Sequence, residues 1–392
     1  MAAAIGIQIG IETEIDEKAR NSPPIAISIS TVRMCSKLEL LHAPSRGLTS
    51  RSLAPTLSAM RIWIDSLRTM SRRHPVPLFR RLALALLVAL VCGCRRQAPI
   101  TEVLSPFTAA EAADAFDQTA RFVALGPRAA GTPGGRRAAD YLERVLRTAG
   151  ASTARIASFE DATPSGVRTF HNVLATFPAA NPQAPWIVLL SHFDTKRDVP
   201  GDTDETPFVG ANDSGSSTGL LLALAARFAR QFPTQPPPCN IMIAFLDGEE
   251  CAVAYSDRDG LHGSRRLARD LRREGLPVRA VILADMIGDR DLLLEIPRNG
   301  TPDLRLLALA CAERLGIRQH VTLGSSIILD DHQPFLDQGF PAINLIDFAF
   351  GSAPGLNDYW HTLQDTMDKL DPKSFQITGS LIIAMMNALC GL

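Results

Sequence analysis

The chain shows two kinds of apolar pattern between residue 101 and residue 190. Residues 109–123 and 136–146 carry apolar side chains at spacings of three and four, which predicts two amphipathic helices. Short apolar runs follow at residues 154–159, 173–177 and 186–190, and these runs predict strands. The last run is continuously apolar, as is typical of a buried central strand.

Strands and helices then alternate along the chain. Apolar runs at residues 241–246 and 281–283 predict two further strands, and helical patterns lie at residues 218–232, 265–274 and 303–315. The first of these helices follows the sequence Asn-Asp-Ser-Gly, which is typical of a helix start. The alternation predicts an α/β fold with a single domain, in which a mostly parallel central sheet carries helices on both faces.

The first hundred residues follow another pattern. Residues 1–69 have no clear helical or strand period, and we predict that they are a non-structural N-terminal extension. Residues 70–94 contain four arginines, then ten apolar residues at 82–91, and they end in Val-Cys-Gly-Cys. A basic flank, a short apolar core and small residues indicate a signal peptide, and the core is too short to span a bilayer comfortably as a permanent helix.

The end of this segment resembles a bacterial lipobox. The resemblance implies cleavage before Cys94 and lipid attachment to that cysteine, whereas an ordinary secretory signal and a short membrane anchor are the alternatives. We therefore expect residues 95–392 to form the folded domain. We expect the protein to be exported, as a membrane-anchored lipoprotein or as a periplasmic protein of a bacterium, and to contact a membrane only through this anchor.

Charge and cysteine content exclude some classes of function. The chain has 40 Lys and Arg against 41 Asp and Glu, and it has no basic stripe with interleaved aromatics, so nucleic-acid binding is not expected. Its seven cysteines have no CxxC spacing, so a zinc site made of cysteines is not expected. The spacing leaves open whether one disulfide forms or none.

Acidic and imidazole residues follow three of the predicted strands directly. His192 and Asp194 follow the first of these strands, Glu249 and Glu250 the second, and Asp285 the third. In an open parallel sheet, ligands bind beyond the carboxyl ends of the strands. We therefore expect these side chains to meet at one edge of the sheet.

The same residue types are the ones that bind catalytic zinc. Taken singly, Asp213 could be a helix N-cap and His361 a surface residue. The adjacent pair Glu249 and Glu250 is harder to explain without a site, because one carboxylate can coordinate a metal while its neighbour transfers protons. The whole set predicts a zinc-dependent enzyme.

The motifs also stand in an order known from one superfamily. The chain carries, in sequence, HxD, Asn-Asp-Ser-Gly, Asp-Gly-Glu-Glu, Asp-Met-Ile-Gly, Asp-His-x-Pro-Phe and Trp-His-Thr-x-x-Asp. This series resembles the zinc aminopeptidases of the bacterial leucyl-aminopeptidase type, a superfamily that includes the animal-type glutaminyl cyclases. The resemblance covers roughly residue 122 to the C-terminus, and it implies that Asp213, Glu250 and His361 hold zinc.

Three details resemble the glutaminyl-peptide cyclotransferases more than the peptidases. They are the segment 255–265, which ends in Gly-Ser-Arg, the Asp-Asp-His-Gln-Pro-Phe-Leu segment at 330–336, and Trp360 before the histidine. The segments 285–288 and 365–366 are instead typical of peptidases. Tyr255 stands where the animal cyclases have a Trp that lines the pocket, so the pocket is expected to differ from theirs in shape.

As a cyclotransferase, the chain would convert the N-terminal glutamine of peptides or proteins to pyroglutamate and release ammonia, with one zinc. The resemblance implies catalytic roles for Glu249, Asp285 and Asp330, with Glu249 transferring the proton. Trp360 and Tyr255 would line the pocket for the glutamine side chain. His192 and Asp194 would support the metal ligands or be remnants of a second metal site.

Two other functions stay open. A two-zinc aminopeptidase would use His192 and Asp285 for the second metal, with Asp213 bridging the two ions and Glu249 activating water. A binding domain without catalysis would be expected to lack metal ligands, and none of the expected ligands is missing from this chain. We favour the cyclotransferase.

Overall fold

The structure is a computed structural model that describes residues 104–391. The predicted extension, at residues 1–69, and the predicted signal peptide, at residues 70–94, lie outside these residues. Eight strands form one sheet: β1 (Thr153–Thr163), β2 (Gly166–Phe177), β3 (Trp186–His192), β4 (Asn240–Leu246), β5 (Val278–Asp285), β6 (Leu294–Ile296), β7 (Val321–Leu323) and β8 (Ala342–Ile346). Their order across the sheet is β1-β2-β4-β3-β5-β8-β6-β7.

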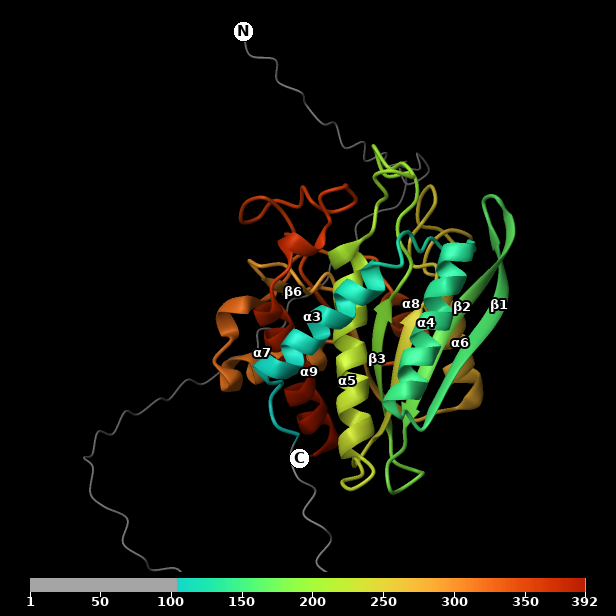
Figure 1. The fold of residues 1–392 in the computed structure, drawn as a ribbon. Coiled ribbons are helices and arrows are strands. Elements are labelled where there is room, and N and C mark those ends of the chain that lie inside the picture. The colour runs from blue at the N-terminus through green and yellow to red at the C-terminus, as the bar shows by residue number, and fades with distance from the viewer. Residues whose placement is uncertain (1–103, 392) are drawn as a thin grey trace, which may run out of the picture. The chain divides into compact units, whose positions relative to one another are not determined.

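Helices lie against both faces of this sheet, as Figure 1 shows for α3, α4 and α5 on the near face and α6 on the far side. The helices are α3 (Ala109–Val123), α4 (Pro133–Ala149), α5 (Ser217–Gln231), α6 (His262–Glu274), α7 (Pro302–Leu315), α8 (Gln333–Asp337) and α9 (Pro372–Cys390). A π-helical segment, η1 (Ala211–Ser216), leads into α5. The predicted α/β fold with helices on both faces is confirmed.

The sheet is parallel in the middle, whereas both kinds of pairing occur toward its edges, where β6 and β7 are parallel. Strands β4, β3, β5 and β8 are parallel to one another. By contrast, β2 pairs antiparallel with both β1 and β4, and β6 pairs antiparallel with β8. The sheet is therefore mixed, because a hairpin such as β1–β2 needs only a tight turn, whereas parallel neighbours need a crossover.

The side chains of the central strands alternate between two cores. On β3, Ile187 and Leu189 pack into the core under α3, α4, α5 and α9, whereas Val188 and Leu190 pack against α6 and α8. This alternation follows from the two-residue period of a strand. Because both faces are covered, the central strands are apolar almost throughout, which is the pattern that predicted them.

The apolar spacing did not predict five of these elements: β6, β7, β8, α8 and α9. The first two have three residues each, which is too short for a period. Helix α9 is buried on nearly all sides, including at Ser374, Thr378 and Ser380, so its sequence has no clear polar face. Among the described residues, no helix is long and apolar enough to cross a membrane.

Within residues 104–391 one disulfide joins two elements of the fold. Cys239, just before β4, is bonded to Cys390 at the end of α9, and their Cα atoms are 5.8 Å apart. The cysteine spacing in the sequence had left open whether one disulfide forms or none. Cys251 and Cys311 are buried and free.

Candidate active site

The predicted site residues meet in one cleft at the carboxyl ends of the central parallel strands. The cleft has a volume of about 260 Å³. Its walls are formed by acidic, aromatic and aliphatic side chains: Asp213, Glu249, Glu250, Tyr255, Asp285, Met286, Ile327, Ile328, Leu329, Asp330, Ile346, Phe348, Trp360 and His361. His192 and Asp194 are buried and do not line the cleft.

The three predicted metal ligands lie close to one another. Nε2 of His361 is 3.3 Å from Oδ2 of Asp213 and 3.1 Å from Oε1 of Glu250. Asp213 comes from η1, Glu250 from the loop after β4, and His361 from the loop before α9. The ring of Trp360 stacks on the imidazole of His361, with 3.9 Å between the ring centroids.

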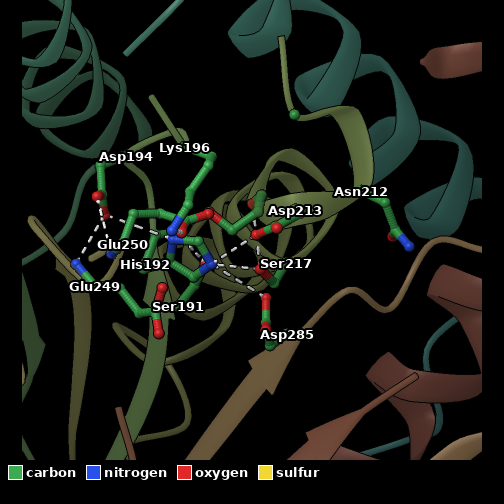
Figure 2. Close-up of polar contacts among 12 residues, drawn as sticks. Ser191, His192, Asp194, Lys196, Asn212, Asp213, Ser217, Glu249, Glu250 and Asp285 are labelled. Atoms are coloured by element: carbon green, nitrogen blue, oxygen red, sulfur yellow. Dashed lines mark hydrogen bonds and ion pairs between the residues drawn. The ribbon is translucent and has the colours of Figure 1, made fainter. Parts of the chain in front are cut away.

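A second group of possible ligands shares Asp213 with the first. Nε2 of His192 is 3.1 Å from Oδ1 of Asp213 and 3.3 Å from Oδ1 of Asp285. Figure 2 shows these three side chains pointing toward one another, His192 from the end of β3 and Asp285 from the end of β5. Asp213 therefore lies between two groups, each of which has the residue types that hold a divalent metal.

Asp194 fixes the turn that presents the two glutamates. Its carboxylate accepts the backbone N–H of Glu249 at 3.1 Å and that of Glu250 at 3.3 Å (Figure 2). It also lies 3.5 Å from Nδ1 of His192. Asp194 thus contacts the loop that carries the predicted ligand and the predicted base, but its side chain is no part of the ligand groups.

Glu249 has the environment of a group that exchanges protons. Its side chain is buried, with 6% of the residue exposed, and it accepts a hydrogen bond of 2.7 Å from the hydroxyl of Tyr255. Burial raises the pKa of Glu249 well above its ordinary value; the charge of His192 opposes this, and the carboxylate of Glu250 adds to it. A positioned carboxyl group whose pKa is raised can take up a proton and return it during a reaction.

Asp330 and Asp285 line the same cleft with different partners. The side-chain amide of Asn344, on β8, donates a hydrogen bond of 2.6 Å to Asp330, whereas Asp285 contacts His192. Burial raises the pKa of both aspartates, and the charge of Asp285 raises that of Asp330 further.

Asp365 orients the segment that carries Asp213. Its carboxylate accepts the backbone N–H of Asn212 at 2.6 Å and that of Asp213 at 3.1 Å. Burial raises the pKa of Asp365 to about 8, with a contribution from the charge of Asp213. The sequence pattern contained Asp365 within the Trp-His-Thr-x-x-Asp motif, but it did not predict this role.

Arg128 is a buried cation under the same site. Its guanidinium donates to the carbonyls of Phe193, Val209 and Gly210 at 2.8 to 3.1 Å, and the residue is fully buried. Burial lowers the pKa of Arg128 to about 10, against the charges of Asp365, Asp194 and Asp213. Arg128 therefore ties the loop after β3 to the segment that enters η1. Arg128 lies outside the motifs that predicted the site, and the sequence predicted no such role for it.

The cleft also has an apolar wall that the sequence did not predict. Ile327, Ile328 and Leu329 precede Asp330, and Phe348 packs on Trp360 with 5.2 Å between the ring centroids. A run of three aliphatic residues has no chemistry of its own that would mark it as part of a site. Together with Trp360, these residues give the cleft an apolar part beside its carboxylates.

The donor types suit zinc. Two carboxylates and one imidazole, from Asp213, Glu250 and His361, form a set that catalytic zinc uses with a further position open. Glu249 and Asp285 are buried in the same cleft, and a bound cation would favour their ionised forms against the cost of burial.

Residues 172–386 match peptidase family M28. The chain is 32% identical over 247 residues to the glutaminyl-peptide cyclotransferase of Gloydius blomhoffii, a match that covers 55% of this chain and only 64% of the snake protein. It is 30% identical over 290 residues to a glutaminyl-peptide cyclotransferase-like protein of Bos taurus, covering 68% of this chain and 73% of the bovine one.

The fold is similar to solved structures as well. A glutaminyl cyclase from an Acidobacteriales bacterium aligns with a TM-score of 0.67 and 31% identity. The alignment covers 76% of this chain and 99% of the bacterial cyclase.

Proposed function

The chain belongs to peptidase family M28, in the branch of the glutaminyl-peptide cyclotransferases, and from this premise we propose that it cyclises the N-terminal glutamine of peptides or proteins. The products would be an N-terminal pyroglutamate and ammonia. The observation that carries the proposal is the meeting of the complete ligand group with Glu249 and Asp330 in one cleft. A proton-transfer group and an acid then face the same substrate atoms.

We propose one zinc, held by Asp213, Glu250 and His361. When bound, zinc supplies Lewis-acid polarisation of the side-chain amide carbonyl of the substrate. Asp194 and Asp365 would keep the ligands in place through the backbone N–H groups that they accept.

The residues of the chain then have to orient the substrate and move a proton. The α-amine of the substrate attacks the carbon of its own side-chain amide, a C–N bond forms, and the bond to the departing nitrogen breaks. Because the attack is intramolecular, much of the acceleration comes from holding the ring-closing conformer. Glu249 takes a proton from the amine and delivers it to the departing nitrogen, which leaves as ammonia.

The remaining cleft residues would contact either the departing nitrogen or the glutamine side chain of the substrate. Asp330 and Asp285, whose pKa values are raised by burial, would interact with the nitrogen that leaves. Trp360 and the ring of Tyr255 would border the aliphatic part of the glutamine side chain. His192 would support Asp213 and Asp285 by its two contacts.

One observation favours a second candidate, a two-zinc aminopeptidase. His192, Asp213 and Asp285 have ligand atoms within 4.8 Å of one another, so a second metal could bind beside the first. In that enzyme Glu249 would activate a water molecule for hydrolysis of the first peptide bond. We favour the cyclotransferase, because the similar proteins that are at least 30% identical over the greater part of the chain are named glutaminyl cyclases or cyclotransferase-like.

The direct test is to incubate the purified protein with a short peptide that begins with glutamine. We expect ammonia release that a chelator abolishes, with the peptide bond intact and a mass lower by one ammonia. Release of free amino acid, with no cyclised peptide, would refute the cyclotransferase and support the aminopeptidase.

We also propose that the protein is exported and anchored by a lipid at Cys94. This proposal is supported by the basic flank, the apolar core and the Val-Cys-Gly-Cys ending of residues 70–94.

A further inference from the structure

Tyr255 does more in this cleft than border it. Its hydroxyl donates a hydrogen bond of 2.7 Å to Oε1 of Glu249. A hydrogen bond to a carboxylate is short and strong compared with one between neutral groups, and it restricts rotation of the acceptor. With Oε1 engaged, Oε2 is the oxygen of Glu249 that stays available to a substrate.

The loop that carries Tyr255 is built around a single carboxylate. Asp259 accepts the backbone N–H groups of Ala252, Val253 and Ala254 at 2.6, 2.8 and 3.0 Å. Three donors on one side chain fix the turn that leads into Tyr255.

The same loop closes back onto Glu249. The N–H of Leu261 donates to the backbone carbonyl of Glu249 at 2.9 Å. Gly260 has a φ of +74°, and a Cβ at this position would lie 2.5 Å from Cδ1 of Tyr255. The absence of a side chain at Gly260 therefore lets the ring of Tyr255 pack directly on the backbone, with its hydroxyl directed at Glu249.

An aromatic wall alone would not need this arrangement. A wall contacts substrate through its ring, whereas the bond to Glu249 uses only the hydroxyl. We propose that Tyr255 is a positioning residue that holds Glu249, through its hydroxyl, in the orientation required for proton transfer. The inference rests on the proposed function in one respect, which is the role of Glu249 as the proton-transfer group.

The test separates the hydroxyl from the ring by Tyr255→Phe. We expect kcat to fall by about tenfold to a hundredfold, the effect of removing a hydrogen bond to a charged group, with KM within about twofold of the wild type. Tyr359→Phe is the matched control, because it removes a hydroxyl from the residue next to Trp360 in the chain, whose ring packs on Phe350 and does not line the cleft. The control should keep the wild-type kcat.

A double-mutant cycle identifies the partner of the hydroxyl. In the Glu249→Gln background, Tyr255→Phe should lower the residual kcat by less than about twofold, because the group that the hydroxyl positions has already lost its function. An equal loss in both backgrounds would overturn the proposal. So would a Tyr255→Phe enzyme with wild-type kcat, or one that has lost its zinc, since the hydroxyl would then support the metal loop.

Failure of the proposed function gives a different result. If the wild type releases amino acids and no ammonia, the cyclotransferase is refuted. The same comparison of kcat, made on the peptidase reaction, still decides whether Tyr255 positions Glu249.

Discussion

Glu249 is the residue on which the proposed chemistry depends most directly. The substitution Glu249→Gln keeps the size of the side chain and removes its ability to accept a proton. We expect ammonia release to fall by about a hundredfold or more, the usual contribution of a positioned acid–base group. Zinc content, measured by elemental analysis, should stay at the wild-type level, because Glu249 is not in either ligand group. A zinc-loaded variant with undiminished turnover would remove Glu249 from the mechanism.

A substitution at Asp285 distinguishes a one-zinc enzyme from a two-zinc enzyme. In a one-zinc enzyme, Asp285→Asn should leave the ratio of metal to protein unchanged while it lowers the rate. In a two-zinc enzyme the ratio should fall, because Asp285 belongs to the second ligand group. Asp330→Asn is the control, since Asp330 lies in the cleft but in neither group, and it should keep its metal in both cases. Loss of zinc from the Asp285 variant alone would contradict the one-zinc site.

Arg128 shows how a residue outside the motifs can hold a site together. Arg128→Met leaves the carbonyls of Phe193, Val209 and Gly210 without their donor and removes a buried positive charge. We expect a loss of unfolding free energy of about 3–5 kcal/mol. Chemical denaturation measures this against Arg227→Met, an arginine on α5 that contacts Ser105 and Glu111 far from the cleft. Equal losses in the two variants would show that Arg128 has no special role.

The sequence predicted the site residues whose own side chains do the proposed chemistry and that stand in motifs, but it did not predict the residues that hold them in place. Asp213, Glu250 and His361 stand in recognisable motifs, and the structure brings them together across 37 and 111 residues of chain. Asp365 and Arg128 act through backbone N–H groups and carbonyls, whose positions depend on the folded chain. No spacing rule predicts such contacts.

At the scale of elements, the apolar spacing predicted a helix or strand correctly where one side of the segment is exposed to solvent. The helix predicted at residues 109–123 is α3, Ala109–Val123, and its buried positions recur on one side. The period failed for α9, which is buried nearly all round, and for β8, whose apolar run is interrupted by the buried Asn344. The sequence also could not predict that β2 pairs antiparallel with β4 or β6 with β8, because these pairings join segments that are distant in the chain.

The contact between α3 and α5 depends on a glycine. A Cβ at Gly219 would lie 2.0 Å from the hydroxyl oxygen of Thr119 and 2.7 Å from the carbonyl oxygen of Ala115. We therefore expect Gly219→Ala to lower the free energy of unfolding by about 1–3 kcal/mol, although alanine favours helices more than glycine does. Thermal unfolding measures the change. An equal or higher Tm would mean that helix propensity outweighs the packing of these two helices.

At the scale of the whole molecule, the chain enters the described domain far from the cleft. The backbone N–H of Leu104 donates to the side chain of Asn387 at 3.2 Å, and the amide of Asn387 donates back at 2.8 Å. Asn387 lies near the end of α9, where Cys390 is joined to the start of β4. These contacts lie at the end of the sheet where the central parallel strands begin, whereas the cleft lies at the end where those strands finish.

The proposed anchor can be tested by fractionation of a bacterial host that expresses the full chain. Wild-type protein should carry lipid at Cys94 and sediment with the membranes, and Cys94→Ser should not be lipidated. We expect the specific activity of the variant to match that of the wild type, because lipid at the N-terminus changes location and not chemistry. A wild-type protein whose mass shows no lipid would refute the lipoprotein proposal.

The disulfide links the stability of the domain to the compartment in which it folds. Cys239 and Cys390 are 151 residues apart, and their bond joins α9 to β4. Closing so long a loop restricts the unfolded chain, so the double variant Cys239→Ala, Cys390→Ala should lose about 2–5 kcal/mol of unfolding free energy. Denaturation with and without a reductant checks the cause, because the reductant should lower the unfolding free energy of the wild type to that of the double variant and leave the double variant unchanged.

Disulfides persist in exported proteins and are rare in a reducing cytoplasm, so protein recovered from the periplasm should contain the bond and protein trapped in the cytoplasm should lack it. A wild type that is insensitive to reductant would contradict both the stabilising role of the bond and the connection with export.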